Sequence, residues 1–419
     1  MKSISLFLFL FLFYFAFSHP KVIINNISRS DIYNETFTTI SGQECYTGYI
    51  EVNETMGAEL FFIFFKSQQG MSQPVALWLQ GGPGCSSEYG AFIENGPILI
   101  QKDYSFIQNP YSWTNYFNML YIDSPVGTGF SYVDNSAGYV NNEDALAEDL
   151  FNGLLVFFDK FFDYYNNDFY VTGESYSGKY VPSLAYKIMS SNSDINLKGI
   201  VIGDGLVDPL PQVLSYSQFA YSLSFFDPIK LAQLQTLEQQ CAAYIQSEQW
   251  EEAGNTFSQI DDFICAHSPV NCYDIRGHSD QGSELSKWLN EQSTQSNLGV
   301  ENITWVSCSP DIWNNFTQDL TKSVKSKIEA LLNNNYKVLL YNGQFDYIIN
   351  LVGVYEWMKD INWSGIDNFL NTTRNVWQVD SQIAGYGKNY ENLWFFMFHN
   401  TGHFVMIKLK MFWICFTDF

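Results

Sequence analysis

The chain has 419 residues, with 21 Lys and Arg against 44 Asp and Glu, so its formal net charge is −23 at pH 7 and its pI is near 4.4. This acidic balance excludes nucleic acid as a partner, because no basic stripe is available to neutralise phosphates. Hydrophobic residues make up 46% of the chain and charged residues 16%, which is too apolar for a disordered protein and enough to bury a large core.

The N-terminus has the features of an export signal. Lys2 is followed by a run of Leu, Phe and Tyr from Leu6 to Phe17, and Ala16 and Ser18 are small residues at a cleavage-type spacing. We expect residues 1–18 to be a signal peptide that directs the chain to the secretory pathway. A membrane anchor is the alternative, but about 12 apolar residues fall short of the ~20 that span a bilayer, so no stable anchor is expected.

Export has two further consequences, for glycosylation and for cysteine. Asn-x-Ser/Thr acceptors would be tolerated or used, and the candidates are Asn26, Asn34, Asn53, Asn302, Asn315, Asn362 and Asn371. None of the seven cysteines has a CxxC or zinc-ligand spacing, so we expect structural disulfides with at least one thiol left over, and buried free thiols are the alternative. The pairing stays open for Cys45, Cys241, Cys265, Cys272 and Cys415.

Apolar runs typical of buried strands alternate with longer stretches that are compatible with helices. The runs are Leu60 to Phe65, Val75 to Leu79, Met119 to Ile122, Phe169 to Thr172, Gly199 to Ile202, Val338 to Tyr341 and Leu393 to Phe398. Their hydrophobicity is continuous rather than alternating, which favours a mostly parallel sheet flanked by helices. Such α/β folds keep their functional sites in loops at the carboxyl edge of the sheet.

After Pro209 the chain becomes rich in Gln, Glu and Tyr and compatible with helices. We interpret residues 209–315 as an inserted helical cap, which leaves 19–208 and 316–405 as the α/β core. The alternative is that this segment is an outer helix layer of the same domain.

The stretch from Asp168 to Gly178 predicts a strand, a tight glycine-flanked turn and a helix. A serine at such an elbow is pushed clear of the sheet, and the next backbone N–H groups face the space before its oxygen. Ser175 is therefore the candidate nucleophile. The motif match is approximate, because Ser177 stands where glycine is usual, and small residues in such turns can also serve helix–strand contacts alone.

A serine nucleophile needs a base, and only two of the five histidines, His399 and His403, follow a predicted core strand. Gly402 frees the loop to carry His403 over the site, so His403 is the expected base. The two histidines could also ligate a metal on a helix face, but the neighbouring glycine favours a loop and no acidic motif accompanies them. We therefore expect no metal.

The third member of such a site is an acid after another strand. Asp346 has this position, although alone it could equally cap a turn. The order Ser175, Asp346, His403 is the one that the α/β-hydrolase fold requires.

Four longer motifs resemble the serine carboxypeptidases, nearest to their vitellogenic-like branch. They are Trp78 to Ser87, Ile122 to Tyr132, Gly173 to Pro182 and Thr401 to His403. The resemblance covers about Ser41 to Val405. It implies an α/β-hydrolase with a cap, secreted or in the lumen of a lysosome or vacuole, that removes single residues from the C-termini of peptides and proteins through an acyl-enzyme and without a cofactor.

The resemblance also implies roles for single residues. Ser175 would be the nucleophile, His403 the base and Asp346 the acid that orients the base, and the N–H groups of Gly82 and Tyr176 would form the oxyanion hole. Glycine suits that place because main chain without a side chain can approach a developing oxyanion.

The family binds the terminal carboxylate of its substrate, and the matching positions here are Gln80, the N–H of Gly81, Glu94 and Glu174. Two close carboxyls cannot both ionise cheaply, so one keeps its proton and can donate it to a carboxylate, which predicts activity at acidic pH. Apart from the family, a Glu beside a Ser could equally be a helix-dipole partner. A disulfide between Cys85 and Cys308 is also implied.

Several positions depart from the family's pattern. Gln80 replaces the usual Asn, Ser177 stands where Ala or Gly is common, and Gln344 stands where Asp is common. Residues 406–419 lack the proline-containing loop and closing helix that the family has after His403, so we describe them only as an atypical tail.

Two other functions fit the same scaffold. An acyltransferase would pass the acyl group to an alcohol instead of water, and a non-catalytic binding or protective protein would need no assembled triad. Peptide hydrolysis against ester-donor transfer separates the first from a peptidase, and phosphonate labelling of Ser175 separates the second. Side-chain preference and oligomeric state are not encoded in these motifs.

Overall fold

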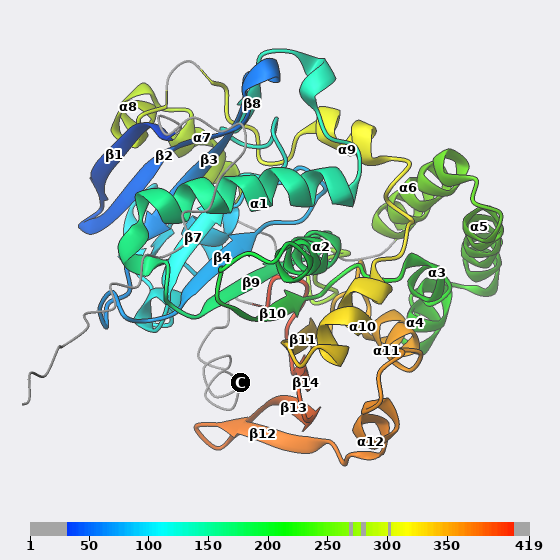
Figure 1. Ribbon diagram of the computed structural model, residues 1–419. Helices are drawn as coiled ribbons and strands as arrows, with labels where there is room; N and C mark the ends of the chain where they lie inside the picture. The colour runs from blue at the N-terminus through cyan, green and yellow to red at the C-terminus, as the bar shows by residue number, and fades with distance from the viewer. Residues whose placement is uncertain (1–31, 268–270, 278–281, 301–302, 406–419) are drawn as a thin grey trace, which may run out of the picture. The chain divides into compact units, whose positions relative to one another are not determined.

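The computed structural model describes residues 32–267, 271–277, 282–300 and 303–405. The signal-peptide prediction for residues 1–18 and the tail at 406–419 fall outside the described residues. Those described build one large sheet with helices on its faces (Figure 1) and a small two-stranded sheet.

The large sheet has 12 strands among the described residues, in the order β1-β2-β3-β7-β4-β9-β10-β11-β14-β13-β12, with β8 paired to β3. The strands are β1 (Ile32–Ile40), β2 (Gln43–Asn53), β3 (Ala58–Phe65), β4 (Val75–Leu79), β7 (Asn118–Ile122), β8 (Tyr132–Val133), β9 (Phe169–Glu174), β10 (Leu197–Gly203), β11 (Lys337–Gly343), β12 (Asn375–Val379), β13 (Gln382–Tyr390) and β14 (Leu393–Phe398). The strands from β7 to β14 in this order are parallel, and the pairs outside them are antiparallel. The small sheet pairs β5 (Ile98–Ile100) with β6 (Phe106–Gln108).

All seven predicted strands are present, and the prediction of a mostly parallel sheet is confirmed. One strand differs: the run from Leu60 to Phe65 lies in β3, which is antiparallel to both of its neighbours, β2 and β7. Its continuous hydrophobicity has a different cause, because aromatic side chains cover both faces of the strand. Phe64 contacts Phe157 on one side, and Phe61 contacts Phe130 on the other.

The helices that cover the parallel strands hold one another in place. Helix α1 (Glu143–Lys160) packs on α2 (Ser177–Ser190), which contacts β9 and β10, and α10 (Lys325–Asn333) contacts α2 and β11. The later helices are α11 (Leu351–Met358) and α12 (Ile366–Asn371). Short turns of helix are η1 (Glu54–Met56), the π-helix η2 (Gly90–Glu94), η3 (Trp113–Asn115), η4 (Ser136–Gly138) and η5 (Phe162–Tyr164). No helix in the described ranges combines the length and the apolar character needed to cross a membrane.

The segment 209–315 contains α3 (Pro209–Val213), α4 (Tyr216–Ser222), α5 (Pro228–Gln246), α6 (Trp250–His267), α7 (Gly282–Leu289), α8 (Gln292–Leu298) and α9 (Pro310–Phe316). Helices α3 to α6 contact one another and α11, whereas α7 and α8 contact η2 and β1 (Figure 1). Leu285, Leu289 and Leu298 of this second group belong to the same hydrophobic core as the sheet. We therefore propose that the cap consists of α3 to α6, and the boundaries 209–315 stay a prediction.

Candidate active site

The carboxyl edge of the parallel strands collects the candidate side chains. Gln80 follows β4, Ser175 follows β9, Asp204 follows β10, Asp346 lies three residues beyond β11, and His403 lies in the loop after β14. These strands are neighbours in the sheet, so residues far apart in sequence meet at one edge, as is general for α/β folds.

Ser175 occupies a strained turn between β9 and α2. Its φ is 62°, a left-handed value that a residue other than glycine adopts rarely and that is typical of a nucleophile elbow. Two hydrogen bonds hold the turn: Ser175 N donates to Gly203 O at 3.0 Å, and Leu206 N donates to Ser175 O at 3.0 Å. Ser175 is partly exposed whereas Glu174 and Tyr176 on either side are buried, so the turn presents the hydroxyl at the surface of the site.

Asp346 and His403 are joined by a buried hydrogen bond, in which Nδ1 of His403 donates to Oδ2 of Asp346 at 2.7 Å. The side chains are 1% and 0% exposed, respectively. The other carboxylate oxygen of Asp346 accepts from Ile349 N at 3.1 Å. Burial lowers the pKa of His403, but the charge and hydrogen bond of Asp346, with the charge of Glu174, outweigh it and the pKa is raised. The carboxylate therefore fixes the tautomer that leaves Nε2 available as a base.

The structure does not join Ser175 and His403 directly. Within the described residues the Oγ of Ser175 makes no hydrogen bond, and the one hydrogen bond of the His403 ring is the one to Asp346. His403 nevertheless interacts electrostatically with Glu174, the neighbour of Ser175, so its ring lies on this side of the sheet edge. Such hydrogen bonds are often long in the absence of substrate and form with it.

The loops that carry the acid and the histidine are bonded to each other. Gln344 N donates to Phe398 O at 3.0 Å, and Phe345 N donates to Thr401 O at 2.7 Å. The side chain of Gln344 accepts from Asn400 N at 3.1 Å. The residue that departs from the family's pattern at position 344 therefore supports the loop that leads to His403.

A segment that sequence reasoning missed holds both loops from the other side. Tyr273 O accepts from His403 N at 2.7 Å, and Cys272 O accepts from Tyr347 N at 3.1 Å. Cys272 is itself in a disulfide with Cys265 at the end of α6. The only feature of the sequence that pointed to this segment was Cys272, and its disulfide partner could not be predicted from the spacing of the cysteines.

The glycine loop after β4 lies directly against the elbow. A Cβ atom on Gly81 would be 2.6 Å from Tyr176 N and 2.7 Å from Ser175 Cβ, so no larger residue fits there. Gly82 has a φ of +116°, which is strained for any other residue. Within the described chain, the N–H groups of Gly82 and Tyr176 donate to no other group, so both remain available as donors.

The expected disulfide between Cys85 and Cys308 is formed. Backbone hydrogen bonds run beside it, from Ser86 N to Ser307 O at 2.9 Å and from Ser309 N to Gly84 O at 2.8 Å. Covalent and backbone bonds together fix the glycine loop to the segment before α9.

Gln80 connects the two glutamates that were predicted to bind a carboxylate. Its Nε2 donates to Glu174 Oε1 at 2.7 Å and to Glu94 Oε1 at 3.3 Å, while its Oε1 accepts from Trp78 Nε1 at 2.8 Å. The indole thereby fixes which end of the amide faces the acids. The hydroxyl of Ser177 donates to Gln80 O at 2.8 Å, so this departure from the family's pattern also supports the group.

Both glutamates are fully buried, and the pKa of each is raised. Burial raises the pKa of Glu94 to about 8, although hydrogen bonds with Glu174 and Gln80 oppose the shift. Burial and then the charge of Glu94 raise the pKa of Glu174 well above its usual value, while the charge of His403 opposes this. The second oxygen of each carboxyl has no partner among the described groups. The pair can thus hold a proton at neutral pH and donate it to an anion.

Asp204 is a further buried acid that the sequence did not indicate. Its Oδ1 accepts from Gly343 N at 2.8 Å and from Asn342 Nδ2 at 3.0 Å. Burial, followed by the charge of Asp346, raises its pKa well above the ordinary value. Asp204, Asp346 and His403 bring ligand-type atoms within 4.8 Å of one another, the one such group of three among the described residues. Nδ1 of the histidine is already bonded to Asp346, so the arrangement is held together by a proton.

The other predicted positions are spread over the surface. Asn53, Asn315, Asn362 and Asn371 are exposed, and Asn34 lies in β1. Asn26, Asn302 and Cys415 lie outside the described residues. Cys45 and Cys241 are buried free thiols, which is the alternative that composition left open for part of the cysteines.

A mostly parallel sheet with a serine elbow, an acid and a histidine after successive strands, in that chain order, defines an α/β-hydrolase. Comparisons with known proteins give the family. The sequence model of the family "Serine carboxypeptidase" matches residues 36–411. The chain belongs to the serine carboxypeptidase family, and its class is that of a serine-type carboxypeptidase.

Individual relatives agree with this assignment. The chain is 36% identical to a probable serine carboxypeptidase CPVL of Dictyostelium discoideum, over 86% of this chain and 75% of that protein. It is 35% identical to the venom serine carboxypeptidase of Apis mellifera, over 86% of this chain and 80% of that protein. The fold is similar to that of Kex1Δp, a prohormone-processing carboxypeptidase from Saccharomyces cerevisiae, with a TM-score of 0.81, 23% identity, and coverage of 93% of this chain and 95% of the other.

Proposed function

We propose that this enzyme hydrolyses the C-terminal peptide bond of peptides and proteins at acidic pH, through an acyl-enzyme on Ser175. The observation that carries the proposal is the buried hydrogen bond between His403 and Asp346 at the sheet edge where Ser175 is partly exposed. The buried pair of Glu94 and Glu174 beside the elbow explains why an exopeptidase rather than an endopeptidase is proposed, because the pair suits a free carboxylate.

The chemistry follows from these positions. Oγ of Ser175 attacks the carbonyl carbon of the last peptide bond and gives its proton to Nε2 of His403, which Asp346 orients and stabilises as an imidazolium. The N–H groups of Gly82 and Tyr176 stabilise the oxyanion. His403 then protonates the leaving amine, and the terminal amino acid departs.

Deacylation repeats the proton transfers with water. His403 takes a proton from water as the hydroxide attacks the acyl ester, and the proton returns to Ser175 when the shortened peptide leaves. Two titrations limit the pH range. The protonated glutamate pair favours binding below about pH 8, where the pKa of Glu94 lies. His403 must be neutral to act as a base, so its pKa sets the acid limit. The charge of Glu174 contributes to the raised pKa of His403, and this contribution is lost when the pair holds its proton, which extends the range to acidic pH.

The carboxylate of the substrate would bind Gln80, the N–H of Gly81, Glu94 and Glu174. Gln80 donates to both acids, and the proton that the acids hold would be donated to a bound carboxylate. A peptide with a free C-terminus should therefore have a much lower KM than the same peptide ending in an amide. Equal KM values for the two peptides would contradict this role of the glutamates.

An organophosphonate label tests the nucleophile. We expect stoichiometric modification of Ser175 and none in Ser175→Ala, with peptide hydrolysis lost in the same variant. Ser190→Ala is the matched control, because Ser190 lies on α2 but is exposed at its far end. A folded protein that takes no label would favour a binding role, and acyl transfer without hydrolysis would favour an acyltransferase.

The secretory location, outside the cell or in a lysosome or vacuole, is also a proposal. It is supported by the two disulfides of the described chain and by exposed acceptor sequences such as Asn362 and Asn371. Expression in a eukaryotic secretory host should give a product whose mass falls on treatment with an endoglycosidase. A product without glycan from that host would remove the support that these acceptors give.

A further inference from the structure

Helix α2 carries a lysine that is completely buried one turn after the proposed nucleophile. The side chain of Lys179 is 0% exposed. Taking an ammonium out of water costs several kcal/mol in real proteins, so a lysine remains there only where its charge and all three of its donors are matched. The groups that match them are therefore informative about what this lysine does.

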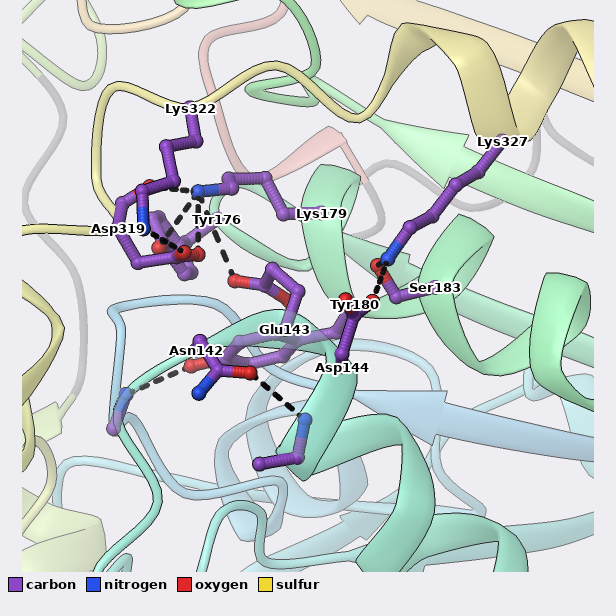
Figure 2. Close-up of polar contacts among 12 residues, drawn as sticks. Asn142, Glu143, Asp144, Tyr176, Lys179, Tyr180, Ser183, Asp319, Lys322 and Lys327 are labelled. Carbon is purple, nitrogen blue, oxygen red and sulfur yellow. Dashed lines mark hydrogen bonds and ion pairs between the residues drawn. The ribbon is translucent and has the colours of Figure 1, made fainter. Parts of the chain in front are cut away.

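Figure 2 shows how the lysine is surrounded. Nζ of Lys179 donates to the hydroxyl of Tyr176 at 3.1 Å, to Oδ2 of Asp319 at 3.0 Å and to the backbone oxygen of Asp319 by a short contact. Glu143 Oε1 lies 3.8 Å away. All three donors of the ammonium are used, and one of them goes to a neutral side chain.

Of the two acids, Glu143 contributes less than Asp319 to compensating the charge of Lys179. Burial raises its pKa to about 8, although the charge of Lys179 opposes this. Asp319 supplies the compensating charge, because it makes the close contact with the ammonium and also faces Lys322 at 3.4 Å. The core of the arrangement is thus a single ion pair, Lys179 with Asp319, bonded to Tyr176.

The hydrogen bond to Tyr176 connects this ion pair to the proposed reaction centre. The backbone N–H of Tyr176 is one of the two proposed oxyanion donors, and the ring of the same residue is held by Nζ of Lys179, which also lies 5.0 Å from the ring centroid. The ring further contacts Tyr180 and Phe316 edge-on, at 5.3 and 6.2 Å between centroids. The side chain is therefore clamped at its polar end and along its sides.

The same helix also contacts the loop that carries the other proposed donor. The hydroxyl of Tyr180 accepts from Gly84 N at 3.3 Å, and Gly84 lies two residues after Gly82 in the glycine loop. Helix α2 is thus bonded both to Tyr176 and to the loop of Gly82.

We propose that Lys179, neutralised by Asp319, is a positioning residue for the oxyanion hole: by holding the hydroxyl of Tyr176 it fixes the main chain whose N–H stabilises the transition state. This inference rests on the proposed function of Ser175 and Tyr176. Donors of this kind contribute only when they are held at the position of the developing oxyanion, so loss of the lysine should lower kcat more than it raises KM.

The test is a double-mutant cycle on Lys179→Met and Tyr176→Phe, measured as kcat and KM for a peptide with a free C-terminus. Tyr176→Phe removes one oxygen and leaves the ring in place. We expect each single variant to lose about 10-fold or more in kcat with KM changed less than about threefold. We expect the double variant to be no worse than Lys179→Met alone, because both changes break the same contact.

The matched control is Lys187→Met on the same helix. Lys187 is also paired with an acid, Glu148, and also lies over an aromatic ring, that of Phe151, but it is partly exposed and far from the elbow along α2. It should keep the kcat of the wild-type enzyme. A cavity of about 730 Å³ lined by Glu143, Asp319 and Lys322 adjoins the buried pair, so water can reach Asp319 when the lysine is removed and the variant should still fold.

The possible outcomes distinguish failure of the proposed function from failure of the positioning role. A wild-type enzyme that neither hydrolyses peptide nor takes the phosphonate label overturns the proposed function itself. An active wild-type enzyme with unchanged kcat in Tyr176→Phe overturns the positioning role, whether or not Lys179→Met folds. Additive losses in the double variant do the same, because they would mean that the two side chains act independently.

Discussion

Two buried acid pairs lie near the elbow, and their negative charge is compensated in different ways. Among the described residues, Glu94 and Glu174 have no ion-pair partner, and the amide of Gln80 joins them. Glu143 and Asp319 lie around the ammonium of Lys179. In the first pair a proton compensates the negative charge, whereas in the second a fixed cation compensates one acid and a proton the other.

The difference indicates two kinds of function. A charge compensated by a proton changes with pH and with a bound anion, which suits a site that must recognise a carboxylate. Compensation by a buried lysine does not change with a bound anion. It therefore suits a pair that holds other residues in place and should not respond to substrate. Four measurements test these two roles.

The largest expected effect is on stability. Lys179→Met removes the fully buried cation and leaves Asp319 with only the partly exposed Lys322, 3.4 Å away, so the free energy of unfolding should fall by about 3 kcal/mol. Glu94→Gln in the other pair replaces an acid that is already largely neutral below pH 8, and it should cost less than about 1 kcal/mol. Urea unfolding at pH 6 measures both. A smaller loss for Lys179→Met than for Glu94→Gln would reverse the comparison.

The pH dependence of stability comes next. The pKa of Glu143 is about 8 in the folded protein against 4.5 normally, so the folded state binds more protons between these values and stability falls as pH rises from 4.5 to 8. Glu143→Gln should remove the part of this loss of stability that Glu143 causes, on the order of 2–4 kcal/mol. Unfolding curves at pH 5 and pH 8.5 test it. Relative to wild type, the free energy of unfolding of the variant should rise only at pH 8.5. An equal change at both pH values would contradict the raised pKa of Glu143.

A smaller effect is expected on substrate binding. KM for a peptide with a free carboxylate should rise by about 10-fold above pH 8, where Glu94 loses its proton and repels the substrate. The amide-terminated peptide should show no such rise. Steady-state kinetics on both peptides from pH 5 to pH 9 give the answer, and a rise shared by the two peptides would point to His403 or to the fold instead.

The smallest effect concerns Asp204. Its pKa is raised well above the usual value, first by burial, which favours the neutral form, and that form resembles an asparagine. Asp204→Asn keeps the oxygen that accepts from Gly343 N and Asn342 Nδ2. We expect kcat within about threefold of wild type. A 100-fold loss would show that Asp204 contributes through its charge.

The sequence could predict what depends on strand order and chain direction. Continuous apolar runs predicted the parallel strands. Ser175, Asp346 and His403 could be predicted from the loops after these strands, because parallel strands end at the same edge of a sheet. It could not predict contacts between distant loops. The bond from His403 N to Tyr273 O joins main-chain atoms that leave no pattern in the side chains. The contacts of α7 with η2 and of α8 with β1 depend on which apolar face each helix buries.

Burial of charge was also beyond the sequence. Lys179 looks like an ordinary polar position near the start of a helix, and Asp319 lies 140 residues later. Only the fold shows that they meet and that the side chain of Lys179 is fully buried. By contrast, the family's pattern located Glu94 and Glu174, although it could not show that the longer Gln80 reaches both.

The position of His403 has a consequence for the newly made chain. The histidine follows β14, which joins the sheet beside β11, so the proposed base is synthesised after every other proposed part of the site. Until that strand has docked, Ser175 lacks the base that the proposed function assigns to it. On that proposal, a chain still on the ribosome should not hydrolyse peptides.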